Sequence, residues 1–374
     1  MKKFLDCISI VGATPSKFHG TKKYVSTGAV ATTEIDESEV VEVTYEDRPS
    51  RANLSAEAGD ILFAKMQGTR KTLLLDSETE ENIYSTGFYA VRANPEVITT
   101  ECLYYLIDSE LFLAQKDKNC SGATQKAITN GGMAKIEISV PALSEQGILV
   151  DKLKHLTQLI ADKKKQLNLF DEIIKSRFIE MFGTLSSNEQ NFEVLTIESL
   201  CSLIKDGTHQ TPTYTEDTIN GFKFLSSKDI MSTKIDWSDI KYIPSDLHEK
   251  LYAVVKPIKN DILMSKNGVN YGVAAVNDTD EVFDIYVSLA LLRPKTDIIN
   301  PVYFRSAINS PDTKRQFDSS IKGIGVPNLH LGEIKKTKIL VPPVDKQNEY
   351  VSFVEQVDKS KYHGEFTCGM EVAA

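Results

Sequence analysis

The stretch that decides the fold is residues 144–183, SEQGILVDKLKHLTQLIADKKKQLNLFDEIIKSRFIEMFG. Counting from Leu149 in alternating steps of four and three gives ten positions, of which eight are apolar. This heptad pattern predicts one long helix with a narrow apolar stripe. Ser144 is the expected N-cap, and Gly183 is the expected stop. The apolar positions are Leu149, Leu153, Leu156, Ile160, Leu167, Phe170, Ile174 and Met181.

The length of this helix determines what it needs from the rest of the chain. At 1.5 Å per residue, about 38 residues extend roughly 57 Å. A one-sided apolar stripe of that length requires a partner helix, and the helix can hold two bodies apart. A chain of 374 residues is long enough for two domains, each with its own core.

Composition narrows the class of protein. The chain is 41% hydrophobic and 25% charged, and no window approaches the ~18 to 20 apolar residues that cross a bilayer. The N-terminus lacks a signal-peptide pattern, so we expect a cytoplasmic protein without a membrane partner. The five cysteines are scattered without a CxxC pair, and the six histidines form no HxxxH, which argues against structural zinc and disulfides. A net charge of −9 argues against nucleic-acid binding unless the charge is unevenly placed.

The chain contains an internal repeat. Residues 60–65 (DILFAK) recur as residues 261–266 (DILMSK), 201 positions later. The same offset, without a gap, aligns Arg92 with Arg293, Pro141 with Pro342 and Gln146 with Gln347. A shared offset over this distance indicates a tandem duplication in which each copy ends at the start of a helix.

We therefore predict an α+β fold with two tandemly repeated domains joined by long coiled-coil-like spacer helices. Strands are expected at 60–65, 89–92 and 135–140 and at their copies, and helices at 100–117 and 303–317. The expected divisions are 1–143, 144–183, 184–343 and 344–361, and then a divergent tail, 362–374. Because Gly364 interrupts that tail and its heptad apolar residues are missing, we expect the second helix to stop near Lys361.

Common catalytic motifs are absent: the sequence has no GxxxxGK[ST], no GxGxxG and no Gly-x-Ser-x-Gly. One alternative stays open, a Mg²⁺-dependent nuclease within residues 311–335. Pro311-Asp312 and Glu333-Ile334-Lys335 imitate a pattern in which two carboxylates hold Mg²⁺ and a lysine stabilises developing charge. The first repeat has Glu110, Leu111, Gly132 and Ala134 at the positions of Pro311, Asp312, Glu333 and Lys335, so the pattern is not duplicated.

The loops of both repeats carry side chains suited to nucleic acid. Lysine and arginine contact phosphates, whereas asparagine, threonine and arginine can also bind base edges. Two similar but non-identical readers on a spacer would recognise a split site with two different halves. A third alternative is a scaffold in which only the helical seam functions. The candidate DNA-binding residues are Thr14, Lys17, Lys65, Arg70, Lys71, Lys126, Thr208, His209, Thr211, Lys228, Lys266, Asn267, Lys322 and Asn328.

The chain resembles the specificity subunit of a Type I restriction–modification system over nearly all of its length, from about residue 1 to 361. The resemblance rests on short stretches that occur in the same order in both halves. They are GATPSK at 12–17, GDIL at 59–62, VPALSEQ at 140–146, DGTH at 206–209, FLSSKDI at 224–230, DIL at 261–263 and VPPVDKQ at 341–347.

The resemblance implies a non-catalytic DNA-recognition subunit with two antiparallel spacer helices. It implies modification (methyltransferase) subunits docked on those helices and restriction subunits in the same complex. It further implies that this chain binds no cofactor or metal itself, and that S-adenosylmethionine, ATP and Mg²⁺ are bound by the partners.

The short second helix is a departure from this family, whose members usually have two long helices. We therefore expect part of the seam around Leu167, Phe170, Ile174 and Met181 to lack a partner within this chain. Another subunit or a second copy of the chain would then cover the open stripe.

Overall fold

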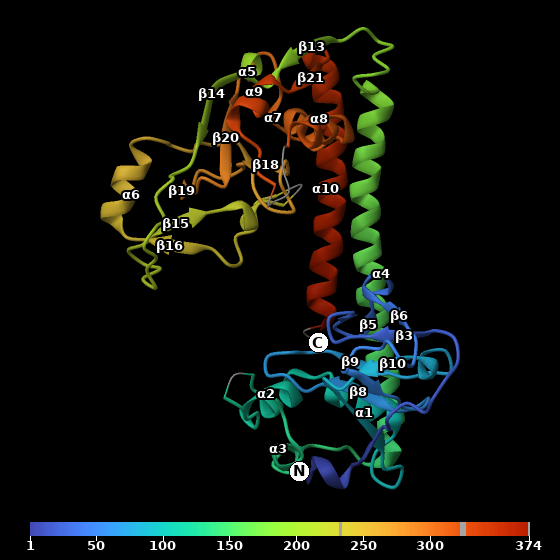
Figure 1. The fold of residues 1–374 in the computed structure, drawn as a ribbon. Helices are drawn as coiled ribbons and strands as arrows, with labels where there is room; N and C mark the ends of the chain where they lie inside the picture. Colours follow the sequence, from blue (N-terminus) through green and yellow to red (C-terminus); the bar gives the residue numbers. More distant parts are fainter. Residues whose placement is uncertain (124, 232–233, 322–326, 373–374) are drawn as a thin grey trace. The chain divides into compact units, whose positions relative to one another are not determined.

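The computed structural model of the protein describes residues 1–123, 125–231, 234–321 and 327–372, with side chains to Lys361 in the last helix (Figure 1). The chain forms two compact units, Met1–Ala161 and Asp162–Ala374. The division falls inside the long helix α4 (Leu143–Phe182). The mixed α+β class and the two repeated domains are confirmed.

Each unit is built on the same four-stranded antiparallel sheet. The strand order is β2-β11-β8-β9 in the first unit and β14-β20-β17-β18 in the second. The pairing register keeps the offset of 201, because Ala90 lies opposite Leu62 and Leu291 lies opposite Leu263. The strands are β2 (Ile8–Val11), β8 (Ile61–Ala64), β9 (Thr72–Leu74), β11 (Phe88–Ala93), β14 (Cys201–Asp206), β17 (Ile262–Ser265), β18 (Ala274–Val276) and β20 (Leu289–Pro294).

An ion pair at the start of the central strand is also duplicated. Arg92 Nε lies 2.6 Å from Asp60, and Arg293 Nε lies 2.8 Å from Asp261. Both aspartates are about 1% exposed, so each carboxylate is compensated by a charged hydrogen bond where burial would otherwise be costly. The aligned arginines seen in the sequence therefore have the same structural role in both units.

A second sheet covers each main sheet. It contains β6-β3-β10-β7 in the first unit and β16-β15-β19 in the second. In both copies the central pair is parallel, β3 with β10 and β15 with β19. The strands are β3 (Lys22–Val25), β6 (Val41–Val43), β7 (Ala52–Leu54), β10 (Ile83–Ser85), β15 (Phe222–Leu225), β16 (Lys241–Ile243) and β19 (Phe283–Ile285).

Two-stranded sheets and short helices add to these layers in the part of the chain that the structure describes. The sheets pair β1 with β12, β4 with β5, and β13 with β21. These strands are β1 (Lys2–Lys3), β4 (Val30–Ala31), β5 (Glu34–Ile35), β12 (Glu137–Ile138), β13 (Glu193–Thr196) and β21 (Lys338–Val341). The helices are α3 (Asn130–Met133), α5 (Ile197–Leu200), α6 (Ser245–Tyr252) and α9 (Leu331–Lys336).

The single helix predicted after β11, and its copy after β20, are each divided into two helices. α1 (Thr100–Ile107) is followed by α2 (Glu110–Lys118), and α7 (Pro301–Ile308) by α8 (Pro311–Ser320). The break occurs because a serine caps the second helix: Ser109 and Ser310 accept hydrogen bonds from the backbone N–H of Phe112 and Thr313. The expectation of one continuous helix was wrong at this point.

α4 closely follows the sequence prediction. It contains 40 residues and ends at Gly183, whose φ of +69° is the left-handed conformation that stops helices. It begins at Leu143, so Ser144 lies inside the helix and is not its N-cap. The proline at 141 explains the early start, because it cannot continue β12 and leads directly into the first turn.

A buried glutamine ties each long helix to the domain before it. Gln146 accepts a hydrogen bond from Thr99 N–H at 2.8 Å and donates to the carbonyls of Val97 and Pro141, both at 3.0 Å. In α10 (Val344–Val372), Gln347 makes the corresponding three bonds, to Asn300 N–H at 2.8 Å, Ile298 at 3.0 Å and Pro342 at 2.8 Å. Both glutamines are 0% exposed, and each buried amide is satisfied by three backbone groups from two segments of its domain.

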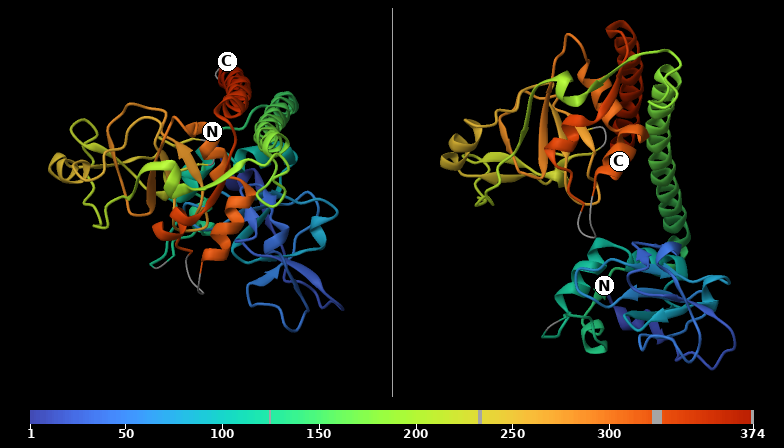
Figure 2. Two further views of the ribbon diagram at one scale, coloured as in Figure 1. Left: turned by 90° about the horizontal axis from the view of Figure 1, so that it is seen from above. Right: turned by 45° about the horizontal axis from the view of Figure 1, so that its top comes forward.

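Within the second unit, α4 and α10 run antiparallel (Figures 1 and 2). Arg177 lies 3.8 Å from Glu349, whereas Asp171, one and a half turns earlier, lies 2.6 Å from Lys361. The expected antiparallel helix pair is thereby confirmed for this part of the chain. The expected stop near Lys361 is wrong, since the helical backbone continues to Val372. One glycine costs only about 1 kcal/mol in a helix that is already propagating.

The seam of α4 is partly buried by the chain itself. Ile174 is 6% exposed, and Phe170 and Met181 pack against the same core. The expectation that these residues need an outside partner was therefore wrong. Leu153 and Leu167 are half-buried, whereas Leu149, Leu156 and Ile160 are 39%, 38% and 41% exposed.

The sequence pattern also missed two buried aromatic residues, Phe178 and Phe182. They pack on Tyr303 of α7 and Tyr350 of α10, with ring centroids 4.9 to 5.6 Å apart. Past Phe170 the buried stripe therefore follows steps of four, because the helix packs against the domain as well as against α10. Among the described residues, no helix is both long and apolar enough to cross a membrane.

The glutamine clamp gives a direct stability prediction. The substitution Gln146→Leu keeps a similar side-chain volume but removes the partner of three part-buried backbone groups. A fully buried unpaired group costs about 1 to 3 kcal/mol and water reaches part of these groups, so we expect the free energy of unfolding of the first unit to fall by about 2 to 4 kcal/mol. Urea unfolding followed by circular dichroism measures this change. Lys152→Leu, on an exposed position of the same helix within the first unit, should change it by less than about 0.5 kcal/mol. Equal stabilities of the two variants would refute the clamp.

Candidate nucleic-acid interface

In the second unit several strand ends meet at one edge. β14 and β17 both run antiparallel to β20, so Asp206 and Ser265 lie beside the start of that strand. β15 and β19 are parallel and end together just before β20 begins. Four loops therefore leave the sheets at the same place, which we call the loop edge: residues 206–215, 226–229, 266–272 and 286–288.

Ser288 connects three of these loops. Its hydroxyl accepts a hydrogen bond from Ser227 N–H at 3.0 Å, and its carbonyl accepts one from Lys266 N–H at 2.8 Å. Thr208 N–H donates to the carbonyl of Ile285 at 3.0 Å. Between these contacts, a Cβ on Gly207 would lie 2.1 Å from the Ile285 oxygen, so only glycine allows this close approach.

The first unit has the same loop edge. Lys65 N–H donates to the Gly87 carbonyl at 2.9 Å, the counterpart of the bond between Lys266 and Ser288. The Lys65 ammonium donates to the Thr86 carbonyl at 2.9 Å, and the Lys71 ammonium to the Thr27 carbonyl at 2.6 Å. These bonds bring the ends of β3, β8 and β10 together, as in the second unit.

A further loop joins the edge in both units. In the first unit Gln67 N–H donates to the Lys126 carbonyl at 3.0 Å, and Ile128 N–H to the Lys65 carbonyl at 2.9 Å. In the second unit Gly268 N–H donates to the Pro327 carbonyl at 3.2 Å, and Leu329 N–H to the Lys266 carbonyl at 2.9 Å. The structure thus brings Lys65 together with Lys126, and Lys266 and Asn267 together with Asn328.

The predicted cations of the second unit are largely neutralised by carboxylates. Lys266 is 5% exposed and forms an ion pair with Asp206. The same carboxylate lies 3.7 Å from His209, whose side chain is 77% exposed. Lys228, in a single turn of 3₁₀ helix, pairs with Asp229 at 2.8 Å and Asp239 at 3.0 Å.

The uncharged candidates of this unit lie on the same loops. Thr208 and Asn267 are half-buried, whereas Thr211 and Asn328 are exposed. Lys322 lies outside the described residues. Because Lys266 is buried, its side chain is placed to position the loops and not to contact a phosphate directly.

The predicted cations of the first unit differ in their exposure to solvent and in their pairing with carboxylates. Arg70 is held by Asp108 through two nitrogens, at 3.1 and 2.9 Å, and by Glu110 at 2.9 Å. These carboxylates, Asp108 first, raise the pKa of the guanidinium. Lys65 is half-buried with its ammonium 4.3 Å from the centre of the Tyr89 ring, and burial lowers its pKa. Lys126 is exposed.

The two earliest candidates lie apart from this group. Thr14 is exposed in the segment after β2, where neighbouring Ala13 pairs with Ser55. Lys17 forms an exposed ion pair with Glu46 at 3.6 Å, in the connection between β6 and β7. The sequence therefore did not separate the candidates at the loop edge from those beside the second sheet, and the role of all of them in DNA binding stays a prediction.

The nuclease alternative finds no support. Asp312 accepts a hydrogen bond from Leu185 N–H at 2.7 Å and pairs with Arg315. Glu333 pairs with Lys336 at 3.3 Å, and Lys335 with Glu198 at 3.1 Å. Each side chain thus has a separate local partner, and across the described part of the chain no three histidine, cysteine, aspartate or glutamate side chains cluster to hold a metal.

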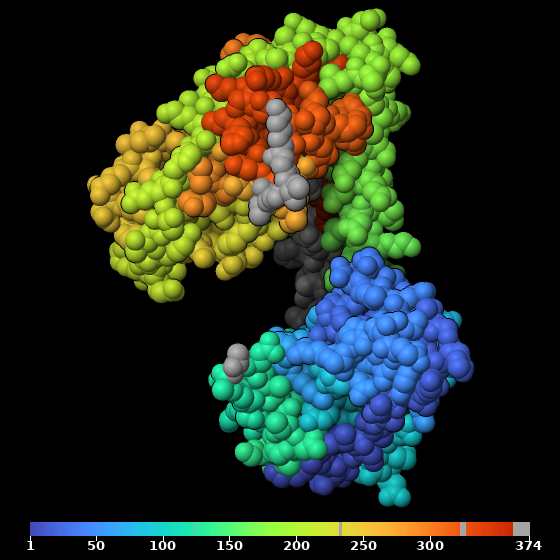
Figure 3. Space-filling model, in the orientation of Figure 1, coloured from blue at the N-terminus to red at the C-terminus, as the bar shows by residue number. Residues whose placement is uncertain are grey.

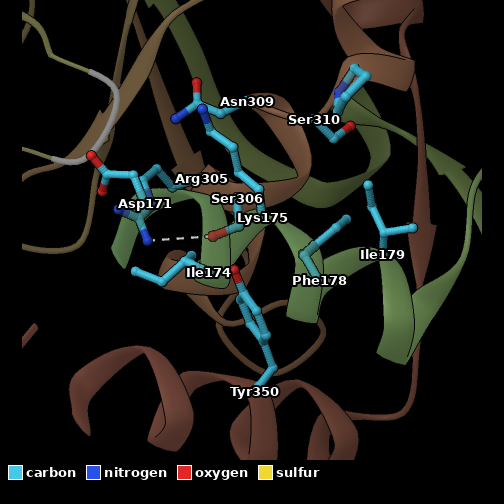
Figure 4. Close-up of a pocket in the computed structure, with 11 residues that line it drawn as sticks. Asp171, Ile174, Lys175, Phe178, Ile179, Arg305, Ser306, Asn309, Ser310 and Tyr350 are labelled. Carbon is cyan, nitrogen blue, oxygen red and sulfur yellow. Dashed lines mark hydrogen bonds between the residues drawn. The ribbon is translucent and has the colours of Figure 1, made fainter. Parts of the chain in front are cut away.

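A mainly apolar cavity lies away from the loop edge, between the second half of α4, α7 and α10 (Figure 4). Its wall includes Ile174, Phe178 and Tyr350, and buried Arg305 donates to Ser306 at 3.3 Å. Ile174, Phe178 and Tyr350 belong to the helix pair, and Arg305 and Ser306 belong to α7, so the cavity lies where the helix pair packs on the domain and not at the candidate interface.

The sequence missed the carboxylates that organise the loops. They include Asp108 and Asp117 in the first unit and Asp206 and Asp318 in the second. Asp117 and Asp318 occupy equivalent positions at the offset of 201, and this signal could have been found. What the loop edge offers chemically is positive charge, amides and hydroxyls on a rigid base, which suits phosphate and base-edge contacts.

Comparison with known proteins supplies independent evidence. Residues 10–169 and 189–363 match the family described as the Type I restriction modification DNA specificity domain. The specificity subunit of the Type I restriction enzyme EcoBI from Escherichia coli is 23% identical over 270 residues, covering 66% of this chain and 56% of that protein. The EcoKI specificity subunit from Escherichia coli strain K12 is 23% identical over 319 residues, covering 80% and 67%.

A crystal structure of the S subunit of a Type I restriction–modification system from M. genitalium is also similar. It is 13% identical with a TM-score of 0.48, covering 100% of this chain and 92% of that one. The chain spans just over half the length of the EcoBI protein.

Because Lys266 is buried and Lys126 is exposed, substitutions of these two lysines should differ in their effect on stability. Lys266→Met leaves Asp206 without its buried cation, and we expect the free energy of unfolding to fall by about 2 to 4 kcal/mol. Lys126→Met, on an exposed loop position, should change it by less than about 0.5 kcal/mol. Urea unfolding of both variants measures the difference. A Lys266→Met protein as stable as the unsubstituted chain would show that this ion pair does not hold the loops.

Proposed function

We propose, because the chain belongs to the Type I restriction modification DNA specificity domain family, that it recognises DNA sequence for a restriction–modification complex. Each unit reads one half of a split site through its own loop edge. The observation that carries the proposal is that two homologous sheets present equivalent loops with different side chains. Equal scaffolds with unequal loops are what two different half-sites require.

The spacer supports a role in assembly. Leu149, Leu156 and Ile160 stay exposed on α4, and exposed apolar side chains along one helix favour a protein partner. In the proposed complex, methyltransferase subunits dock on the long helices, and restriction subunits join them. A second copy of this chain is the alternative occupant of the exposed stripe.

DNA methylation and DNA cleavage are assigned to the partner subunits of the complex. In this proposal the chain binds neither cofactor nor metal, the methyltransferase subunits bind S-adenosylmethionine, and the restriction subunits use ATP and Mg²⁺. The complex acts in the cytoplasm, where the DNA is. The role of this chain is then to select the site and to hold the partners there.

Methylome sequencing tests the proposal. A host that produces the partner subunits is compared with and without this chain. We expect a methylated motif with two specified halves and an unspecified gap, present only with the chain. Methylation that is unchanged when the chain is removed would overturn the proposal, and so would a motif without a gap.

The exposed lysine of the first loop edge gives a binding prediction. Lys126→Ala should weaken binding of the reconstituted complex to all DNA sequences and reduce the slope of log K against log salt by about one. Competition binding over a series of salt concentrations measures this slope. Lys3→Ala is the matched control, because Lys3 lies in the separate β1-β12 sheet, outside the loop edge, and pairs with Glu137 at 2.6 Å. Equal slopes for the two variants would exclude a phosphate contact at Lys126.

A further inference from the structure

Lys116 is a buried cation that the proposed function does not use directly. It lies on α2 with 2% exposure, and burial lowers the pKa of its ammonium. It is among the largest fully buried side chains of the chain. A buried lysine is costly unless its donors are satisfied, so its partners indicate its purpose.

The ammonium of Lys116 is enclosed by the first reading loop, residues 65–71. Nζ donates to the carbonyls of Thr69 at 2.7 Å, Met66 at 2.8 Å and Ala64 at 3.3 Å. A lysine has three donors, and all three are used on one short stretch of backbone. The backbone of this loop therefore curves around the ammonium, with three carbonyl oxygens directed at it.

The next residue of α2 holds the same loop from outside. Asp117 accepts a hydrogen bond from Gly68 N–H at 2.9 Å, and its carbonyl accepts one from the Gln67 side chain at 3.3 Å. Gly68 has a φ of +71°, a conformation that favours glycine and that this contact fixes. Together Lys116 and Asp117 determine the course of residues 66–69.

The second unit holds its equivalent loop by different means. At the position of Lys116 it has Phe317, which is fully buried, and a Cβ on Gly272 would lie 2.8 Å from that ring. At the position of Asp117 it has Asp318, which pairs with Lys314 at 2.8 Å and with the Tyr271 hydroxyl. The two loops are thus shaped by different helix residues although their sheets are alike.

From this contrast we propose that Lys116, with Asp117, is a positioning residue that sets the half-site specificity of the first unit. Lys116 is too deeply buried to contact DNA, yet it fixes the loop that carries Lys65, Arg70 and Lys71. In the space-filling view, the teal segment with α1 to α3 lies directly against the blue segment that carries the sheets (Figure 3). The inference rests on the proposed function, since it concerns which bases the loop reads.

The test exchanges the buried donors for an apolar side chain of similar size. Lys116→Met is produced in the full chain with its partner subunits, and the methylome is sequenced. We expect one half of the split motif to relax, with methylation of sites mismatched in that half rising about tenfold, while the other half keeps its sequence. Phe317→Leu is the matched variant in the second unit, and it should relax the other half only.

The controls separate positioning from folding and from the proposed function. A merely structural role would lower methylation at all sites without changing the motif, and this outcome would overturn the inference. Relaxation of the same half by Lys116→Met and Phe317→Leu would also overturn it. If Lys116→Met does not accumulate as folded protein, Asp117→Ala, which removes the contact to Gly68, must relax that half or the inference is wrong. A split motif missing from the unsubstituted chain would instead overturn the proposed function itself.

Discussion

The structure depends on a buried glutamine amide at the start of each long helix. Gln146 accepts a hydrogen bond from Thr99 N–H and donates to the carbonyls of Val97, just before α1, and Pro141, just before α4. Gln347 makes the equivalent three bonds to the segments before α7 and α10. Because each fully buried amide joins two segments of its domain, it fixes the start of each long helix to that domain. Gln115 and Gln316 add a second duplicated clamp by bonding both backbone groups of Glu137 and Lys338.

The ion pairs of the two sheets are the same in both units, whereas the ion pairs of the loop edges differ. The pairs of Arg92 with buried Asp60 and of Arg293 with buried Asp261 are alike in both units. At the edges the units differ: Arg70 is neutralised by Asp108 and Glu110, and Lys266 by Asp206. A protein with a net charge of −9 thus presents cations that are already ordered by carboxylates. Ordered cations lose less conformational entropy on binding than free ones, which favours specificity over general attraction to phosphate.

Much of the fold was predictable from residues that recur at one offset. The strands at 60–65 and 261–266, the long helix ending at Gly183 and the antiparallel helix pair were all expected and are present. The errors have physical causes. Phe178 and Phe182 fall outside a strict heptad because they pack on a domain, and periodicity alone cannot show that. Serine caps divided two predicted helices, and one glycine did not stop α10.

The candidate interface was harder to predict than the fold. The sequence pointed to loops that the structure brings together at one edge, since lysine, threonine and asparagine gather there. It did not show that Lys266 is buried or that Arg70 is paired with acids, because their partners lie about 40 and 60 residues away in the chain. The roles of the candidate residues in DNA binding and of the α4 stripe in partner binding stay predictions.

The central claim is that each unit reads one half of the target independently, on a scaffold that both share. An exchange of residues 1–140 for the equivalent domain of another family member, followed by methylome sequencing, tests it most directly. The account predicts that one half of the methylated motif changes and that the other half stays as it was. An unchanged motif, or a change in both halves, would contradict it.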